Sequence, residues 1–165
     1  IENGMKVTAN IKVENINYLK NHSFEDKDAS MWEVTYVKNS DGTDVQTKAG
    51  DAMTGENSFH WYHTSDQEFK VEQKLTAEKT SEYTALANIQ GGDVGDDAVV
   101  YLYVLVNGVE YKSQPVVLDG WVNWKVPIIT DIPVNEGDEV IVGMYVKCAA
   151  AGWGTIDDFE FYSQK

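Results

Sequence analysis

The stretch Ala151-Gly-Trp-Gly-Thr-Ile-Asp-Asp-Phe-Glu-Phe-Tyr162 decides the fold. From Thr155 onward apolar and polar residues alternate, which is typical of a β-strand that buries one face. Two glycines flank Trp153, so we expect a sharp turn that brings the indole to the surface. Asp157 and Asp158 stand where a purely structural strand would carry apolar residues. The end of the chain therefore predicts a strand that joins core packing to an exposed aromatic plane and a hard-cation ligand.

Length and charge limit the kinds of protein this can be. The chain has 165 residues, 42% of them hydrophobic, which suits one well-filled core better than two domains. Its net charge is -14, from 27 acidic residues against 13 basic ones, and every basic residue is lysine. Nucleic acids and anionic membranes require clustered cationic side chains. We therefore expect a neutral ligand or a cation, with no nucleic-acid partner and no membrane insertion.

The ends of the chain and its single cysteine point to an excised module. Residues 1–15 form a polar segment that we interpret as a linker or an added strand, with the domain over residues 16–165. No cationic-then-apolar leader and no apolar run of about 18 residues is found. Cys148 lies in an apolar alternation, which predicts a buried thiol. We expect an extracellular module, secreted or attached to the cell surface.

Period-2 segments recur along the chain between turn signals, and helix signals are nearly absent. The predicted strands cover residues 32–37, 58–63, 68–75, 83–90, 99–106, 116–118, 123–126, 139–147 and 155–162. Asn107-Gly108 gives the strongest hairpin signal, because a type I′ turn needs positive φ at both central residues. The pattern predicts an all-β fold, a β-sandwich of two antiparallel sheets.

The aromatic residues divide into expected core and expected surface. Trp32 and Trp61 alternate with apolar neighbours within strands, so both are predicted to be buried. Trp121 and Trp124 are an odd number of positions apart, so they should point to opposite faces. Trp121 follows a turn, which favours it as the ligand-facing one, and Trp153 is the other main candidate. A purely structural domain predicts that every tryptophan is buried, whereas a binding domain predicts at least two exposed ones.

A sugar is one kind of neutral ligand that such residues could bind, because aromatic planes cover the apolar C–H face of a pyranose and polar side chains bind its hydroxyl groups. Aromatic, amide, imidazole and ammonium side chains of these kinds occur in a few segments of the chain. The predicted carbohydrate-binding residues are Trp121, Trp153, Gln90, Asn123, Asn88, Lys147, His60 and Tyr62.

Several blocks of the sequence carry a family resemblance. They are Ser30-Met-Trp-Glu33, Val71-Glu-Gln73, Ile89-Gln-Gly-Gly-Asp93, Asp119-Gly-Trp-Val-Asn-Trp124 and Ala151-Gly-Trp-Gly-Thr-Ile-Asp-Asp158. Together they resemble carbohydrate-binding module family 61, the β-1,4-galactan-binding modules of endo-galactanases. The resemblance implies a jelly-roll β-sandwich that binds galactan and targets an attached glycoside hydrolase to pectic galactan. The chain departs from the family at Ala150-Ala151, where a glycine-rich step is expected.

The resemblance also implies one structural calcium ion. The positions that match its ligands are Ser23, Glu25, Asp51 and Asp158. Calcium takes six to eight oxygen ligands and mixes carboxylates with backbone carbonyls. Glu25 and Asp158 would offer side-chain oxygens, and Ser23 and Asp51 would offer carbonyls. The alternative is that these acidic residues are ordinary surface carboxylates at strand ends.

Catalysis has little support in the sequence. Asp93, Asp96 and Asp97 form the obvious carboxylate cluster, but they lie in a glycine-rich turn where polarity alone explains them. The histidines show no metal-ligand spacing with Cys148 and no nucleophile motif accompanies them. We therefore predict a non-enzymatic module. A module for another β-linked polysaccharide, such as xylan or β-glucan, and a structural or adhesive surface domain remain the alternatives.

Overall fold

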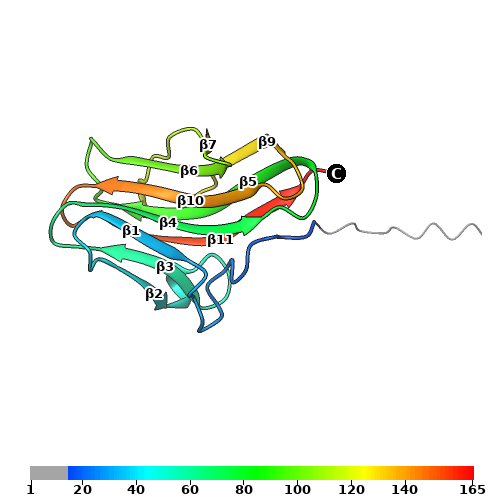
Figure 1. Cartoon of the computed structure of the whole chain (residues 1–165). Helices are drawn as coiled ribbons and strands as arrows, with labels where there is room; N and C mark the ends of the chain where they lie inside the picture. Colours follow the sequence, from blue (N-terminus) through cyan, green and yellow to red (C-terminus); the bar gives the residue numbers. More distant parts are fainter. Residues whose placement is uncertain (1–14) are drawn as a thin grey trace, which may run out of the picture.

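Two antiparallel sheets pack face to face (Figure 1). The structure is a computed structural model and describes residues 15–165. The first sheet has the order β1 (Glu33–Lys38), β4 (Gln67–Thr76), β10 (Glu139–Cys148), β6 (Val99–Val106) and β7 (Val109–Lys112). The second sheet has the order β2 (Thr43–Thr47), β3 (Asn57–Tyr62), β11 (Trp153–Ser163), β5 (Ser81–Gly92) and β8 (Gly120–Lys125), and β9 (Ile128–Val134) also pairs with β5. A short 3-10 helix, η1 (Ala49–Asp51), joins β2 to β3. The predicted all-β sandwich is confirmed.

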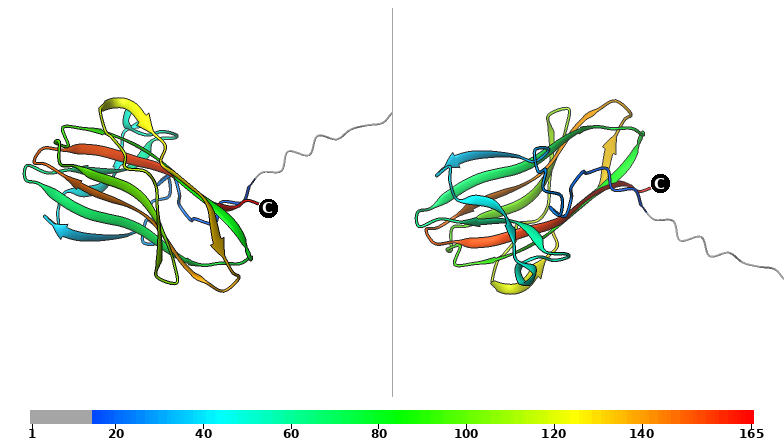
Figure 2. Two further views of the ribbon diagram at one scale, coloured as in Figure 1. Left: turned by 90° about the horizontal axis from the view of Figure 1, so that it is seen from above. Right: turned by 90° about the horizontal axis from the view of Figure 1, so that it is seen from below.

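The start and the end of the described chain lie side by side, as Figure 2 shows from two directions. The backbone N–H of Tyr18 donates to the carbonyl of Phe161 over 2.9 Å. The Asn17 side chain donates to the carbonyl of Phe159 over 2.9 Å and accepts from the N–H of Phe161 over 3.1 Å. Residues 17 and 18 are therefore tied to the sandwich. The interpretation of residues 1–15 falls, apart from Asn15, outside the described residues and stays a prediction.

The inward faces of the two sheets supply the core. Trp32 and Trp61 are both buried, as predicted, and so is Cys148. The rings of Trp32 and Phe159 lie 4.6 Å apart between centroids, which joins the loop before β1 to the last strand. Aromatic pairs at this separation add to the stabilisation from burial alone. Among the described residues, no helix is both long and apolar enough to cross a membrane.

The hairpin prediction is confirmed, and some strand predictions are wrong. Asn107 and Gly108 both have positive φ, of 47° and 83°, between β6 and β7. Residues 116–118 form no strand, although the N–H of Val116 bonds to the carbonyl of Val100 over 2.8 Å. β2 and β9 lie outside the predicted strands. β9 contains Pro133, which lacks an N–H. It pairs with β5 alone, and an edge position tolerates proline.

We predict that Ile156→Ala lowers the free energy of unfolding by about 2–5 kcal/mol, because Ile156 is 0% exposed between the sheets. Ile128→Ala is the matched control, since Ile128 is 49% exposed on β9. It should cost less than about 1 kcal/mol. Urea unfolding measures both changes. Equal losses for the two variants would contradict this placement of the core.

Candidate functional site

The outward face of the second sheet brings together several of the predicted sugar-binding residues. In the register of β11 with its neighbours, Trp153 lies between Tyr62 of β3 and Gly92 of β5. Two residues further along, Thr155 lies between His60 of β3 and Gln90 of β5. Side chains two positions apart in a strand share a face. Two rows of residues therefore cross this face side by side: an aromatic row of Tyr62, Trp153 and Gly92, and a polar row of His60, Thr155 and Gln90.

Trp153 is half-buried and lies across the backbone of β5. A Cβ atom on Gly92 would be 2.9 Å from Cζ2 of the indole, so only glycine leaves room for the ring there. The indole N–H donates to Oδ2 of Asp93 over 3.0 Å. Asp93 has a φ of 53°, a left-handed conformation that aspartate tolerates better than most residues. The ring of Trp153 is thus held at its face by Gly92 and at its edge by Asp93.

The glycines that flank Trp153 serve close packing and not a turn. Neither has a left-handed φ; the turn residue is Ala151, with a φ of 65°. A Cβ atom on Gly154 would be 2.0 Å from Cη2 of the buried Trp61, and one on Gly152 would be 2.9 Å from Sγ of Cys148. This corrects the sequence-based reason for the two glycines. The turn occurs at Ala151, where the family resemblance led us to expect a glycine-rich step.

Trp121 is 63% exposed and stands in an irregular part of β8. Gly120 pairs with Gly91 and Lys125 pairs with Ile89, so the residues between them bulge away from the regular register. The indole N–H of Trp121 donates to Oδ1 of Asp51 over 2.8 Å. A Cβ atom on Gly50 would be 3.9 Å from Cζ2 of the same ring. Trp121 therefore contacts η1, and Trp153 contacts the end of β5.

Asp51 is fixed as a carboxylate. Its Oδ2 accepts from Nζ of Lys48 over 2.9 Å and from Nε2 of Gln46 over 3.0 Å. Partial burial alone would raise the pKa of Asp51, but the hydrogen bonds from Lys48, Trp121 and Gln46 outweigh it and hold the pKa below its ordinary value. The acceptor for the Trp121 indole is thus charged at neutral pH.

The buried side chain of Gln90 connects three segments that meet on this face: η1, β11 and β8. Its Nε2 donates to Oγ1 of Thr155 over 2.9 Å and to the carbonyl of Asp51 over 3.2 Å. Its Oε1 accepts from the N–H of Val122 over 2.5 Å. Because Gln90 is 0% exposed and its amide is engaged on both sides, it positions η1 and β8 and does not offer free groups to a sugar. This corrects the prediction of Gln90 as a direct sugar contact.

The other predicted binding residues divide between this face and the rest of the molecule. Tyr62 is exposed beside Trp153, and Nδ1 of His60 lies 2.7 Å from Oδ1 of Asp44. Asn123 is exposed on β8, two residues beyond Trp121, and donates to Asp119. Asn88 shares the face but is covered, and it donates to the carbonyl of Asp158 over 3.3 Å.

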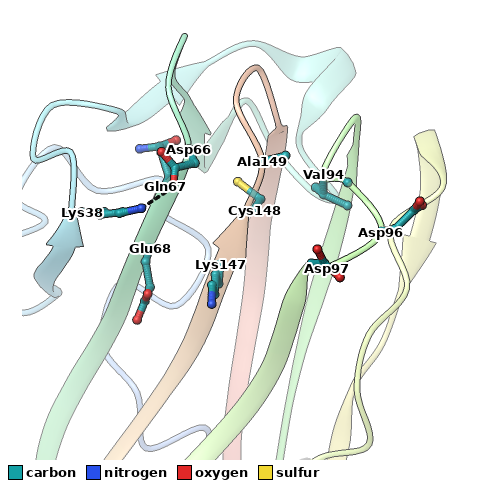
Figure 3. A pocket seen from close by; sticks show the side chains of 11 residues that line it. Lys38, Asp66, Gln67, Glu68, Val94, Asp96, Asp97, Lys147, Cys148 and Ala149 are labelled. Carbon is teal, nitrogen blue, oxygen red and sulfur yellow. Dashed lines mark hydrogen bonds and ion pairs between the residues drawn. The ribbon is translucent and has the colours of Figure 1, made fainter.

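Lys147 lies on the first sheet, opposite Glu68 and Val99, and not beside the tryptophans. It lines a cavity of about 260 Å³ at the end of the sandwich, together with residues such as Cys148 and Asp97 (Figure 3). The residues that line this cavity include no aromatic side chain. The structure therefore does not bring Lys147, or the amide of Asn88, to the exposed aromatic face.

Two adjacent carboxylates of β11 hold the loop before β3. Oδ2 of Asp157 accepts from the N–H groups of Met53 and Thr54 over 2.8 and 3.2 Å, and the Asp157 side chain is fully buried. Asp158 has a φ of 46°, and both its carboxylate oxygens accept from Oγ1 of Thr54. Burial, and then the Asp158 carboxylate, raise the pKa of Asp157 to about 7. Of the two carboxylates, Asp157 is therefore the one that points into packed structure.

The predicted calcium ligands do not all meet. Oε1 of Glu25 accepts from the N–H groups of Glu56 and Asn57 over 3.0 and 2.8 Å, so Glu25 and Asp158 secure the same loop. Asp51 points elsewhere: its carboxylate serves Trp121, and its carbonyl accepts from Oγ1 of Thr155 over 2.7 Å. Within residues 15–165, no three His, Cys, Asp or Glu side chains cluster as a metal site. The carbonyl of Asp51, which was the predicted ligand, also accepts from Nε2 of Gln90 over 3.2 Å. The calcium site stays a prediction.

Comparisons with known proteins place this architecture among sugar-binding modules. The chain is similar to TmCBM61, solved in complex with β-1,4-galactotriose: 27% identity, a TM-score of 0.80, and coverage of 90% of this chain and 99% of that one. Two more distant modules share the fold alone. One is a CBM22-1 xylan-binding domain from Paenibacillus barcinonensis, with 16% identity, a TM-score of 0.56, and coverage of 87% of this chain and 92% of that one. The other is a family 35 carbohydrate-binding module from Clostridium thermocellum, with 20% identity, a TM-score of 0.54, and coverage of 82% and 94%. No protein-family model and no curated protein matches the sequence.

We predict that Gln90→Ala destabilises the protein by about 1–3 kcal/mol, because the N–H of Val122 loses its acceptor and the carbonyl of Asp51 loses a donor. Gln114→Ala removes an exposed glutamine outside any strand and should cost less than about 0.5 kcal/mol. Urea denaturation compares the two. A Gln90→Ala variant as stable as the wild type would show that this amide does not hold the face together.

Proposed function

We infer that this chain, a module of the family 61 type, is a non-catalytic carbohydrate-binding module for β-1,4-galactan. The observation that carries the inference is the pair of tryptophans on the outward face of the second sheet, each of which donates its indole N–H to a carboxylate. The similarity to a module solved with β-1,4-galactotriose supports the choice of ligand.

The proposed binding chemistry follows from the exposed groups. Each indole offers a flat apolar surface for the C–H face of a galactose ring. The exposed amide of Asn123, two residues beyond Trp121, can accept from or donate to hydroxyl groups of the sugar. A β-1,4-galactan chain has an axial oxygen at each link and therefore coils. Two separate indoles suit such a curved chain better than one continuous flat strip.

Hydrolysis does not fit this site. A glycosidase requires two carboxyl groups in environments that drive their pKa values apart across one sugar bond. Asp93 and Asp51 instead each accept a tryptophan N–H, and the perturbed Asp157 lies under the loop before β3. The groups with unusual environments are therefore structural, and binding is the activity that remains.

The biological role that we propose is targeting. An attached glycoside hydrolase would be held near pectic galactan, which raises its effective substrate concentration even at modest affinity. Affinities of this kind lie in the micromolar to millimolar range, or about -8 to -4 kcal/mol. Such a module would act outside the cell, in a secreted or surface-attached protein.

Isothermal titration with β-1,4-galactotriose tests the proposal. The wild type should bind saturably, while Trp153→Ala and Trp121→Ala should each lose at least about 2 kcal/mol, or about 30-fold. Trp124→Ala is the matched control, because Trp124 is half-buried on β8 and is the tryptophan predicted to pack. It should change the affinity less than about threefold.

Xylo-oligosaccharides and cello-oligosaccharides complete the test. Binding of either of these with no heat from galactotriose would move the assignment to another β-linked polysaccharide. No heat from any sugar, in a folded sample, would favour a structural or adhesive domain.

We also propose one structural calcium ion at the loop before β3, held by Glu25 and Asp158 with the carbonyl of Ser23. The support is a pair of carboxylates, on Glu25 and Asp158, that bind the same loop beside the buried carboxylate of Asp157. When bound, the ion would neutralise part of the negative charge of these carboxylates and would connect residues 23–25 to β11. It would add stability only through its preference for the folded state.

Chelation tests the calcium proposal. Removing an ion that was present at about 100 times its Kd should cost about 2.7 kcal/mol and lower the Tm by about 5–10 °C. Ca²⁺ should restore the Tm and Mg²⁺ should not. Glu25→Gln should abolish the response, whereas Glu33→Gln, an equal charge change on the exposed start of β1, should keep it. A Tm that does not change with calcium would contradict the proposed ion.

A further inference from the structure

Trp121, which is exposed, and Trp153, which is half-buried, are held by similar local arrangements. Trp121 and Trp153 each follow a glycine, and each indole N–H reaches the aspartate of a Gly-Asp pair: Gly50-Asp51 for Trp121 and Gly92-Asp93 for Trp153. In both cases the glycine of the pair faces Cζ2 of the ring. The ring requires a glycine only at Gly92, because a Cβ atom on Gly50 would be at an ordinary contact distance of 3.9 Å. Two unrelated places in the sequence therefore share one device, a carboxylate at the N–H edge of the indole.

Two kinds of contact fix these rings. The hydrogen bonds, at 2.8 and 3.0 Å, are in the range of well-formed bonds to a charged acceptor. The absence of a side chain on Gly92 lets the Trp153 ring lie against the backbone, where a Cβ atom would be only 2.9 Å away. An exposed indole without these contacts would sample several rotamers, and a ligand would have to immobilise it on binding.

We propose that Asp93 and Asp51 are positioning residues that fix the orientation of the two indoles before sugar arrives. The proposal rests on the proposed galactan-binding function of this face. According to this proposal, the protein and not the ligand sets the angle between the two indole planes.

Asp93 offers the cleaner test, since Asp51 also binds Lys48 and Gln46. Asp93→Gly removes the carboxylate and still accommodates the positive φ of 53° at this position. Asp93→Asn keeps an oxygen that can accept from the indole. Asp96→Gly is the matched control, because it removes an equal charge from an exposed position in the same turn.

The first readout is the indole resonance of Trp153 in sugar-free, ¹⁵N-labelled protein. Asp93→Gly should shift this resonance and lower the order parameter of the indole N–H from a rigid value near about 0.85 to below about 0.6. Asp93→Asn and Asp96→Gly should stay near the wild type. The second readout is titration with β-1,4-galactotriose, where Asp93→Gly should bind about three- to tenfold more weakly and Asp93→Asn within about twofold of the wild type.

The outcomes separate this proposal from the proposed function. An Asp93→Gly indole as rigid as that of the wild type would overturn the positioning role. Weak binding by Asp93→Asn with a rigid indole would also overturn it, because the charge would then act on the sugar directly. If the wild type binds no galactan while Asp93→Gly still loosens the indole, the positioning role stands and the galactan assignment fails.

Discussion

The pairing of β5 with β11 is the constraint on which the rest of the structure depends. Its register sets Thr155 opposite Gln90 and Trp153 opposite Gly92. A shift of β11 by one residue would turn Ile156 out of the core and would move the Trp153 indole away from Gly92. One register thus determines the core, the buried amide and the aromatic platform together.

The outward face of the second sheet is unusual because polar side chains are buried on it. The segment that contains η1 and the loop before β3 covers Gln90, Thr155 and Asp157, and each of them bonds to that segment. Because buried polar groups must find partners, these bonds specify where the segment lies. The segment in turn carries Asp51 to the indole of Trp121. Polar burial therefore places the exposed ring.

The strand pattern was predictable from the sequence, since alternation and turn residues are local signals. The core positions of Trp32 and Trp61 and the Asn107-Gly108 hairpin follow from them. The burial of Gln90 was not predictable, because it depends on a segment that crosses the sheet from far along the chain. The covering of Asn88 was unpredictable for the same reason, since strand alternation assigns a face but not what covers it. Lys147 lies on the other sheet, and alternation does not say which sheet a strand joins. The roles of Asp51 and Asp93 also required the three-dimensional structure.

The central claim is that galactan binds on the outward face of the second sheet, through two indoles. A ¹H–¹⁵N titration of the labelled protein with β-1,4-galactotriose tests it most directly, because each tryptophan gives its own indole signal. The account predicts that the signals of Trp121 and Trp153 shift in a saturable way, while those of the buried Trp32 and Trp61 stay fixed. Saturable binding that leaves the Trp121 and Trp153 signals unmoved would contradict it and place the site elsewhere on the sandwich.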